Sequence, residues 1–176
     1  KFPHSQYFIP NLINEYIRAG ENDKALDYLD QAIKNDPNNA CDLNSVKAAL
    51  YAETAEYDKA EAEYKKALAQ DKDCERAVEG LAVNYIIQAQ ELKDKSAQEL
   101  ADRKAQAEYD KKTIEFYQLS LPYLEKFFEL LEARDATKPE MNSALIKLQN
   151  VYYNLSNLGI DKSAELEEVE QQLEGN

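Results

Sequence analysis

Few side chains in this sequence are suited to catalysis or metal binding. His4 is the only histidine, and the two cysteines are Cys41 and Cys74. A zinc site needs three or four Cys or His ligands, and a nucleophilic side chain needs a base beside it. One histidine and two distant cysteines do not readily assemble either arrangement. We therefore expect no catalytic residue, no metal and no cofactor, and a protein that is not an enzyme.

Two further kinds of site also lack their requirements. The acidic stretch Asp71–Glu75 would need glycine at the sixth position and glutamate at the twelfth to form an EF-hand calcium loop, but Arg76 and Ala82 stand there. No glycine-rich phosphate loop is present either. The carboxylates are too numerous, at 34 Asp and Glu, for any pair to indicate acid–base catalysis.

The charge balance bears on the kind of partner. The formal net charge is −13, and the 21 basic residues are interleaved with the acidic ones. Phosphate backbones and anionic membranes attract clustered Lys and Arg, so we expect neither a nucleic-acid partner nor membrane insertion. We interpret the acidity as a means of keeping a helical surface soluble, and attraction to basic partners is the alternative.

Composition indicates the elements that position these side chains. Glycine occurs 4 times, 44% of residues are hydrophobic, and helix formers such as Ala, Leu, Glu and Lys are common. No segment alternates apolar and polar residues with β-branched enrichment. We therefore predict an all-α fold in one domain, residues 1–176.

Tyrosines recur at a regular step, because Tyr16, Tyr51 and Tyr85 are spaced by 35 and 34 residues. Other positions repeat in the same way, in pairs: Ala25 and Ala60, Leu29 and Tyr64, Ala32 and Ala67, Pro3 and Pro37. A step of this length fits two helices and two turns. The small residues would let neighbouring helices approach closely, and the large residue between them would fill the remaining gap.

This pattern resembles the tetratricopeptide-repeat (TPR) family, which implies a right-handed α-α superhelix. The first repeat, about 6–39, matches the family pattern at Ile9, Leu12, Tyr16, Ala25, Leu29, Ala32 and Pro37. The second, about 41–74, matches at Ala48, Tyr51, Ala60, Tyr64 and Ala67. It departs at Asn44 and Lys47, where apolar residues are expected. Pro3 falls where an upstream repeat would close, so we expect further repeats before Lys1.

The third repeat, about 75–138, is interrupted by an expected insertion at about 94–119. Ser96–Glu99 is typical of a capping box, which predicts one helix at about 75–93 and a second at about 97–134. This pair would form a hairpin extending roughly 20 Å beyond the repeats. Leu100, Ala107 and Ile114, spaced by seven, would form its seam, and Pro122 would kink the second helix.

A last repeat, about 142–174, would form a capping helix pair. Gly159–Asp161 is its expected turn, followed by a final helix at about 161–174. That helix would place Ala164, Val169 and Leu173 on one face. The segments 121–126 and 151–155, Leu-Pro-Tyr-Leu-Glu-Lys and Val-Tyr-Tyr-Asn-Leu, resemble the C-terminal end of a group of exported bacterial TPR proteins. This resemblance implies a periplasmic or cell-envelope location and leaves a cytoplasmic one open.

The cysteines lie near the two ends of the second repeat, since Cys41 opens its first helix and Cys74 closes its second. Antiparallel helices bring such ends together, so a disulfide is one alternative. We expect two free thiols instead, because a disulfide requires Cα atoms within about 7 Å.

Ligands of TPR proteins usually lie in the concave groove formed by the first helices. By transfer of register, this resemblance implies groove residues Tyr7, Asn14, Ile17, Arg18, Ala49, Ala52, Glu53, Arg76, Val83 and Ile87. Val83, Ile86 and Ile87 could equally pack against the inserted hairpin.

We expect a non-catalytic scaffold that binds a peptide or protein in the groove or on the hairpin. The alternative is a structural capping or self-association segment with no ligand of its own. The chain would be a monomer or a weak homodimer, and its partner is not identified by the sequence.

Overall fold

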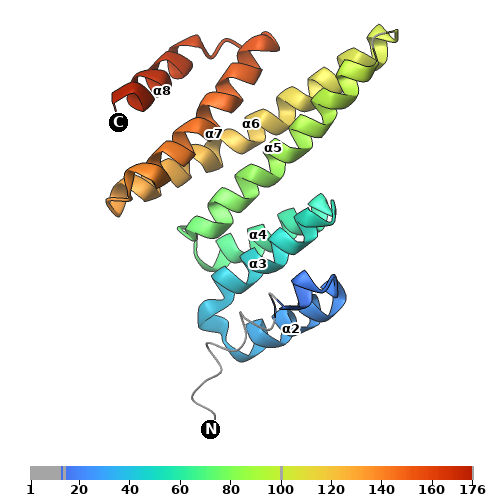
Figure 1. Cartoon of the computed structure of the whole chain (residues 1–176), viewed down its shortest axis with the longest axis vertical. Coiled ribbons are helices and arrows are strands. Elements are labelled where there is room, and N and C mark those ends of the chain that lie inside the picture. Colours follow the sequence, from blue (N-terminus) through green and yellow to red (C-terminus); the bar gives the residue numbers. More distant parts are fainter. Residues whose placement is uncertain (1–12, 14, 100, 176) are drawn as a thin grey trace. The chain divides into compact units, whose positions relative to one another are not determined.

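The computed structural model describes residues 13, 15–99 and 101–175, and these residues form an all-α structure without a strand (Figure 1). The prediction of an all-α fold is confirmed. The elements are α2 (Asn22–Asn35), a 3-10 turn η1 (Pro37–Asn39), α3 (Ala40–Glu53), α4 (Tyr57–Gln70), α5 (Glu75–Gln98), α6 (Arg103–Ala133), α7 (Lys138–Asn157) and α8 (Ser163–Gly175). They divide into two compact units, Lys1–Gly80 and Leu81–Asn176, with the boundary inside α5.

In the first unit, α3 packs against both α2 and α4. The small residues of the repeat pattern are buried where these helices approach each other: Ala25, Ala32, Ala60 and Ala67. Leu29 and Tyr64 occupy equivalent positions on α2 and α4, and both are buried. The role expected of small and large residues at these positions therefore agrees with their burial.

The turns before α2 and α4 have the same backbone geometry. Gly20 and Ala55 lie 35 residues apart and have positive φ angles of 72° and 59°. The next residue in each turn donates its N–H to a tyrosine carbonyl over 2.9 Å, from Glu21 to Tyr16 and from Glu56 to Tyr51. These bonds close the end of the preceding helix as a left-handed C-cap does. The repeat step seen in the sequence is thus a repeat of local structure in this unit.

The expectation of free thiols is wrong, because Cys41 and Cys74 form a disulfide with their Cα atoms 6.2 Å apart. Cys41 lies in the first turn of α3, and Cys74 directly precedes α5. The starts of these two helices lie closer together than the prediction assumed. The disulfide therefore links the beginning of α3 to the beginning of α5.

Asn44 and Lys47, the polar departures from the TPR pattern, are both buried on α3. The Lys47 ammonium lies 2.5 Å from Asp30 Oδ1 of α2 and 3.5 Å from Glu63 Oε1 of α4. Burial lowers the pKa of Lys47, but the hydrogen bond to Asp30 and the charges of Glu63 and Asp30 outweigh it, so the net pKa is raised. Lys47 therefore stays charged while its apolar stem packs inside the unit.

In the second unit, α5 and α6 are long helices joined by residues 99–102. The expected capping box at Ser96 is wrong, because α5 continues to Gln98. The Ser96 hydroxyl instead donates to Asp110 Oδ1 of α6 at 2.5 Å. Asp102 caps α6, and its carboxylate accepts from the backbone N–H groups of the second and third helical residues.

The expected seam between these helices is also wrong in part. Ala107 is exposed, and Leu100 lies outside the described residues. Ile114 is half-buried and packs against the core. The buried face of α6 is carried instead by Thr113 and Tyr117, both fully enclosed. The Tyr117 hydroxyl donates to Gln90 Oε1 of α5 at 3.4 Å, so this buried face, and not the predicted seam, contacts α5.

The helix α6 continues through Pro122 without ending there. Thr137 and Glu140 form a capping box at the start of α7, which the sequence reading did not single out. The expected turn at Gly159 is confirmed, with φ at 86°. On α8, Val169 is buried and Leu173 is partly buried in the core, but Ala164 is exposed, so its expected position on that face is wrong.

Candidate functional site

Among the described groove residues of the first unit, both arginines form ion pairs with carboxylates of this unit. Tyr7 and Asn14 lie outside the described residues. Ile17 is half-buried and packs against the core of this unit. Arg18 is exposed, and its guanidinium lies 3.2 Å from the Glu15 carboxylate. Neither Ile17 nor Arg18 therefore offers an unpaired group for a ligand.

On α3, Ala49 and Ala52 are half-buried and Glu53 is exposed. Arg76, in the first turn of α5, has its Nε atom 3.5 Å from Asp42 Oδ1 of α3. Both side chains of this pair are about 60% exposed, so solvent weakens the attraction. The α3 face is thus lined by small residues between charged groups, with little apolar area.

In the second unit, the α5 residues separate into inward and outward positions. Ile86 packs against the core, whereas the side chain of Ile87 is 37% exposed and Val83 is half-buried. Ile87 therefore belongs to the surface of this unit. Glu91 and Asp94 follow it on the same helical face and are exposed.

The largest exposed apolar side chains of this unit lie on α7 and were missed by the sequence reading. Ile146 and Tyr153 are 56% and 57% exposed. They belong to one face of α7, here called the α7 outer face, which consists of Ser143, Ile146, Asn150, Tyr153 and Asn157. All five side chains are exposed, and none is charged. This face thus differs from the chain as a whole, in which 31% of residues are charged.

A signal for this face was present in the sequence. Ile146 and Tyr153 are seven residues apart, so they share one side of a helix. Leu145, Leu148 and Tyr152 define the opposite, buried side. Ile146 and Tyr153 are therefore the apolar residues that the core does not require.

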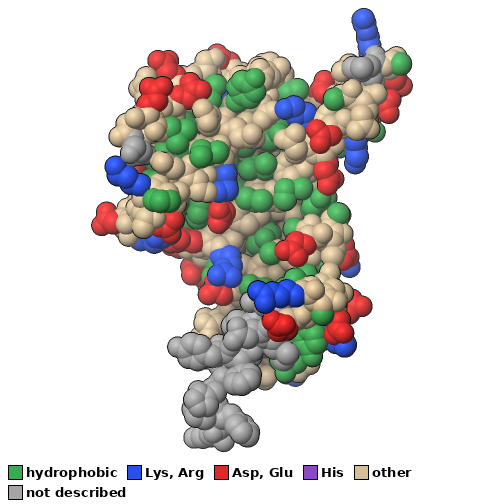
Figure 2. All heavy atoms as spheres, viewed as in Figure 1, with side chains coloured by type: hydrophobic (Ala, Val, Ile, Leu, Met, Phe, Trp, Pro, Cys, Tyr) green, Lys and Arg blue, Asp and Glu red, His purple; other side chains and the backbone are tan. Residues whose placement is uncertain are grey.

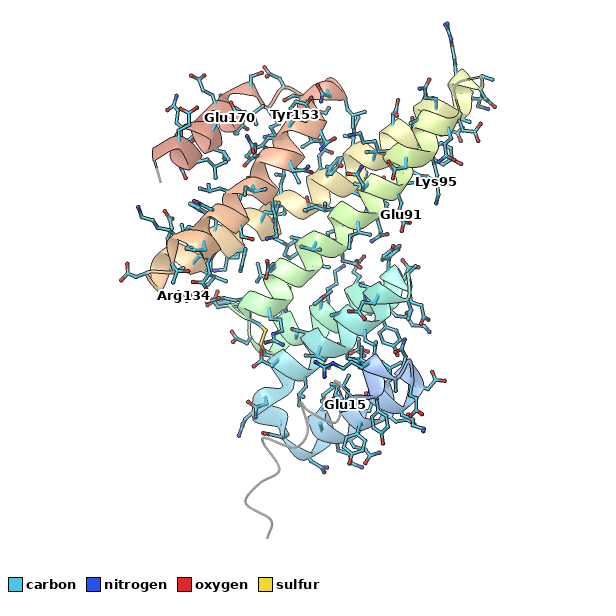
Figure 3. The ribbon with its side chains drawn as sticks, viewed as in Figure 1. Glu15, Glu91, Lys95, Arg134, Tyr153 and Glu170 are labelled. Carbon is cyan, nitrogen blue, oxygen red and sulfur yellow. A yellow bond between two sulfur atoms is a disulfide. The ribbon has the colours of Figure 1, made fainter. Side chains whose placement is uncertain are left out.

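α5 and α7 lie side by side in the second unit. The Lys93 ammonium of α5 donates to Asn154 Oδ1 of α7 at 2.6 Å. Asn154 in turn donates from Nδ2 to the backbone carbonyl of Asn150 at 2.7 Å. Figure 2 shows hydrophobic side chains at the surface over α5 and α7, and Figure 3 shows Tyr153 on α7 next to α8.

A separate open cavity of about 490 Å³ lies where α6 ends and α7 begins, beside the end of α8. Its lining includes Phe128, Met141 and Leu145, together with Glu132 and Lys138. The lining combines apolar side chains with two residues of opposite charge. This lining does not favour one class of ligand over another.

The Tyr152 side chain lies on the buried side of α7, opposite the α7 outer face. Burial, with the nearby Glu125 carboxylate, raises the pKa of Tyr152 above its usual value, and the Tyr152 hydroxyl donates to Glu125 at 3.2 Å. Within residues 13, 15–99 and 101–175, no group of three or more His, Cys, Asp or Glu side chains is placed to hold a metal ion. The α7 outer face offers apolar contact through Ile146 and Tyr153 and amide hydrogen bonds through Asn150 and Asn157.

Comparison with known protein families and with curated proteins finds no match to this chain. Among the helices described, none has a stretch long and apolar enough to cross a membrane.

Proposed function

We propose that this protein is a non-catalytic scaffold that binds a peptide or protein segment on the α7 outer face. The observation that carries this proposal is the uncharged and exposed character of that face. Ile146 and Tyr153 each leave more than half of their surface open to solvent. Exposed apolar groups gathered in one place favour a partner, because burying them releases about 25 cal/mol per Å².

The residue types on this face suit a protein ligand. Tyrosine provides a large and fairly rigid contact surface with a polar tip, and it is enriched at binding sites. Asn150 and Asn157 can donate and accept hydrogen bonds, as an extended or helical backbone and its side chains require. A partner would bury Ile146 and Tyr153 as anchors while the asparagines fix its orientation.

We further propose that the chain is a TPR-type helical repeat protein in which α5 and α6 contain an inserted hairpin. The repeated turns at Gly20 and Ala55 support the repeat. The helices α2, α3 and α4 are each 14 residues long, whereas α5 has 24 and α6 has 31. This difference in length supports an insertion in the third repeat. In that family, α5 and α7 would be groove helices.

The disulfide supports a location outside the cytoplasm. Disulfides persist in oxidising compartments and are rare where glutathione keeps thiols reduced. Cys41 and Cys74 would therefore remain paired in a periplasm or at a cell surface. Thiol labelling of the protein taken directly from its cells tests this location, and two free thiols would contradict it.

Capture of partners from an extract of the source organism tests the proposed function. The parent protein is compared with Ile146→Ser/Tyr153→Ser, which removes both anchors without adding charge. Leu119→Ser/Tyr28→Ser is the matched control, because Leu119 and Tyr28 are 41% and 36% exposed on α6 and α2. Circular dichroism must first show that all three proteins are folded.

We expect a protein that the parent and the control capture and that the α7 variant loses. Equal capture by all three proteins would contradict binding at this face. If nothing is captured and the parent associates with itself as its concentration rises, the structural or self-association alternative gains support.

A further inference from the structure

One border of the α7 outer face is formed by α8, whose described residues include glutamates but no lysine or arginine. Glu167, Glu170 and Glu174 are spaced by three and four residues, so they share one side of α8. All three side chains are exposed. Within residues 13, 15–99 and 101–175, no lysine or arginine forms an ion pair with any of them.

A hydrogen bond fixes which side of α8 faces the α7 outer face. Gln149 Nε2 donates to Glu170 Oε1 at 3.3 Å. Gln149 lies between Ile146 and Tyr153 along α7, three and four residues from them, and so adjoins the outer face. The row of three glutamates therefore runs along the side of α8 that adjoins Ile146 and Tyr153; Figure 3 labels Glu170 of this row and Tyr153.

The glutamates of α8 are also level with Ile146 and Tyr153 of α7. α7 and α8 run antiparallel, since a short turn joins them and they pack together (Figure 1). With Gln149 opposite Glu170, the Glu167 end of the row lies toward Tyr153 and the Glu174 end toward Ile146. Each row spans seven residues, which is about 10 Å of helix. Two apolar anchors thus lie parallel to a row of carboxylates of equal length.

The opposite border of the α7 outer face carries a different charge. The Lys147 ammonium donates to the Ser143 hydroxyl at 2.7 Å and lies on the side of α7 away from Gln149. Of the residues on α7 and α8, the carboxylates beside Ile146 and Tyr153 therefore lie on the α8 side, whereas the exposed Glu91 and Asp94 belong to α5. A partner that pairs with the glutamates of α8 must present basic residues on that side.

Resting on the proposed function, we propose that the partner of this surface is a basic amphipathic helix. Two apolar residues about seven positions apart would contact Ile146 and Tyr153. Lysine or arginine residues on the adjacent side would pair with Glu167, Glu170 and Glu174. Charge complementarity of this kind determines which partners associate and how quickly. A second copy of this chain is a poor occupant, because its net charge of −13 repels the same row.

The test uses three synthetic helical peptides with identical leucine positions and with lysine, glutamine or glutamate on the flanking side. Their binding to the full chain is measured by fluorescence anisotropy at about 0.15 M salt, where the screening length is about 8 Å. We expect the lysine peptide to bind about tenfold or more tightly than the glutamine peptide, and the glutamate peptide to bind least. Sedimentation confirms that the protein is monomeric in the assay.

Glu167→Lys/Glu174→Lys should abolish the preference for the lysine peptide. Glu108→Lys/Glu115→Lys is the matched control, because it reverses two exposed glutamates seven residues apart on α6 and changes the net charge equally. The control should keep the preference. A preference that both variants lose equally, or that neither loses, would overturn the proposal in favour of a net-charge effect.

Ile146→Ser/Tyr153→Ser separates this inference from the proposed function. If lysine and glutamine peptides bind equally and this variant loses both, the α7 outer face binds segments but the basic partner is wrong. If the variant binds every peptide as the parent does, both the inference and the binding face are contradicted. If no peptide binds the parent, the basic helix is rejected as the occupant, and partner capture from the extract still decides the function of the face.

Discussion

The ring of Tyr64 lies against the backbone of Gly80, in the space where a β-carbon would stand. A β-carbon built at Gly80 would lie 2.6 Å from the Tyr64 hydroxyl oxygen and closer still to two ring carbons. Tyr64 is 5% exposed, so its ring cannot move aside into solvent without losing its burial. This contact explains why α5, a helix, carries glycine at that position despite its low helix propensity.

We therefore predict that Gly80→Ala lowers the free energy of unfolding by about 2 kcal/mol, as overpacking of a tight core does. Alanine at an open helix position would instead stabilise the protein. Adding Tyr64→Leu should restore much of the loss, because Leu29 fills the equivalent position on α2. Urea unfolding of the two variants measures both effects. A neutral or stabilising Gly80→Ala would contradict the contact.

Reduction of the disulfide between Cys41 and Cys74 should destabilise the first unit. The two cysteines are 33 residues apart, and closing a loop of that length in the unfolded chain contributes about 4 kcal/mol. Cys41→Ser/Cys74→Ser should lose stability to a similar extent and should no longer respond to reductant. Thermal melting with and without reductant checks this, and a parent protein indifferent to reductant would contradict the pairing.

Lys47 should contribute through its apolar stem more than through its charge. Its side chain is 10% exposed, and Asp30, its closest partner, is 59% exposed and so remains hydrated without it. The buried Glu63 carboxylate keeps the Lys66 ammonium at 2.8 Å. Lys47→Met keeps the stem, and we predict a change within about 1 kcal/mol. Lys47→Ala removes about three buried methylenes and should cost about 2 kcal/mol. If methionine is as damaging as alanine in denaturant unfolding, the ion pairs carry the stability instead.

Stability should fall at alkaline pH because of buried tyrosines. Burial, with the nearby Glu79 charge, raises the pKa of Tyr64 to about 12 from its usual 10. The folded state thus favours the protonated phenol. Its contribution is complete below pH 10 and is lost as the pH rises through about 12. A shift of this size corresponds to a loss on the order of 2–3 kcal/mol.

The measurement for this pH dependence is unfolding followed by circular dichroism from neutral pH upward, with phenolate absorbance recorded in parallel. Tyr64→Phe is the control, since it keeps the ring and removes the ionisable group. We expect a smaller loss of stability above pH 10 in that variant. An identical loss in both proteins would assign the effect to other groups.

Sequence reasoning succeeded where one residue type has one strong structural consequence. The repeated alanines, Leu29 and Tyr64 indicated close helix packing, and all of them are buried. The turn at Gly159 followed from the conformational freedom of glycine. The burial or turn geometry at such positions is determined by local backbone conformation and by packing between neighbouring helices. The repeat pattern in the sequence indicates both.

The reading failed where the same local signal has two uses. Ser96–Glu99 and Thr137–Glu140 both match a capping box, but only the second forms one. The Ser96 hydroxyl bonds to Asp110 instead, a residue brought near by the return of α6. The disulfide likewise depended on a Cα separation of 6.2 Å that the spacing of Cys41 and Cys74 does not fix.

The candidate site was predicted only in part. The expected groove included Ile87, which is exposed, but omitted Ile146 and Tyr153. The sequence reading used the apolar residues of the last repeat to place its core. It made no prediction of which of these apolar residues lie outside the core. Exposure of a side chain depends on the helices around it, so this distinction required the packing of α7 between its neighbours.

The most direct measurement of the central claim is photo-cross-linking from position 153. A benzoylphenylalanine at Tyr153 is compared with the same group at Leu119, an exposed position on α6, in an extract of the source organism. We predict that position 153 cross-links to a discrete partner and that position 119 does not cross-link to the same partner. The same products from both positions, or none from position 153 while the protein remains folded, would contradict a binding site on the α7 outer face.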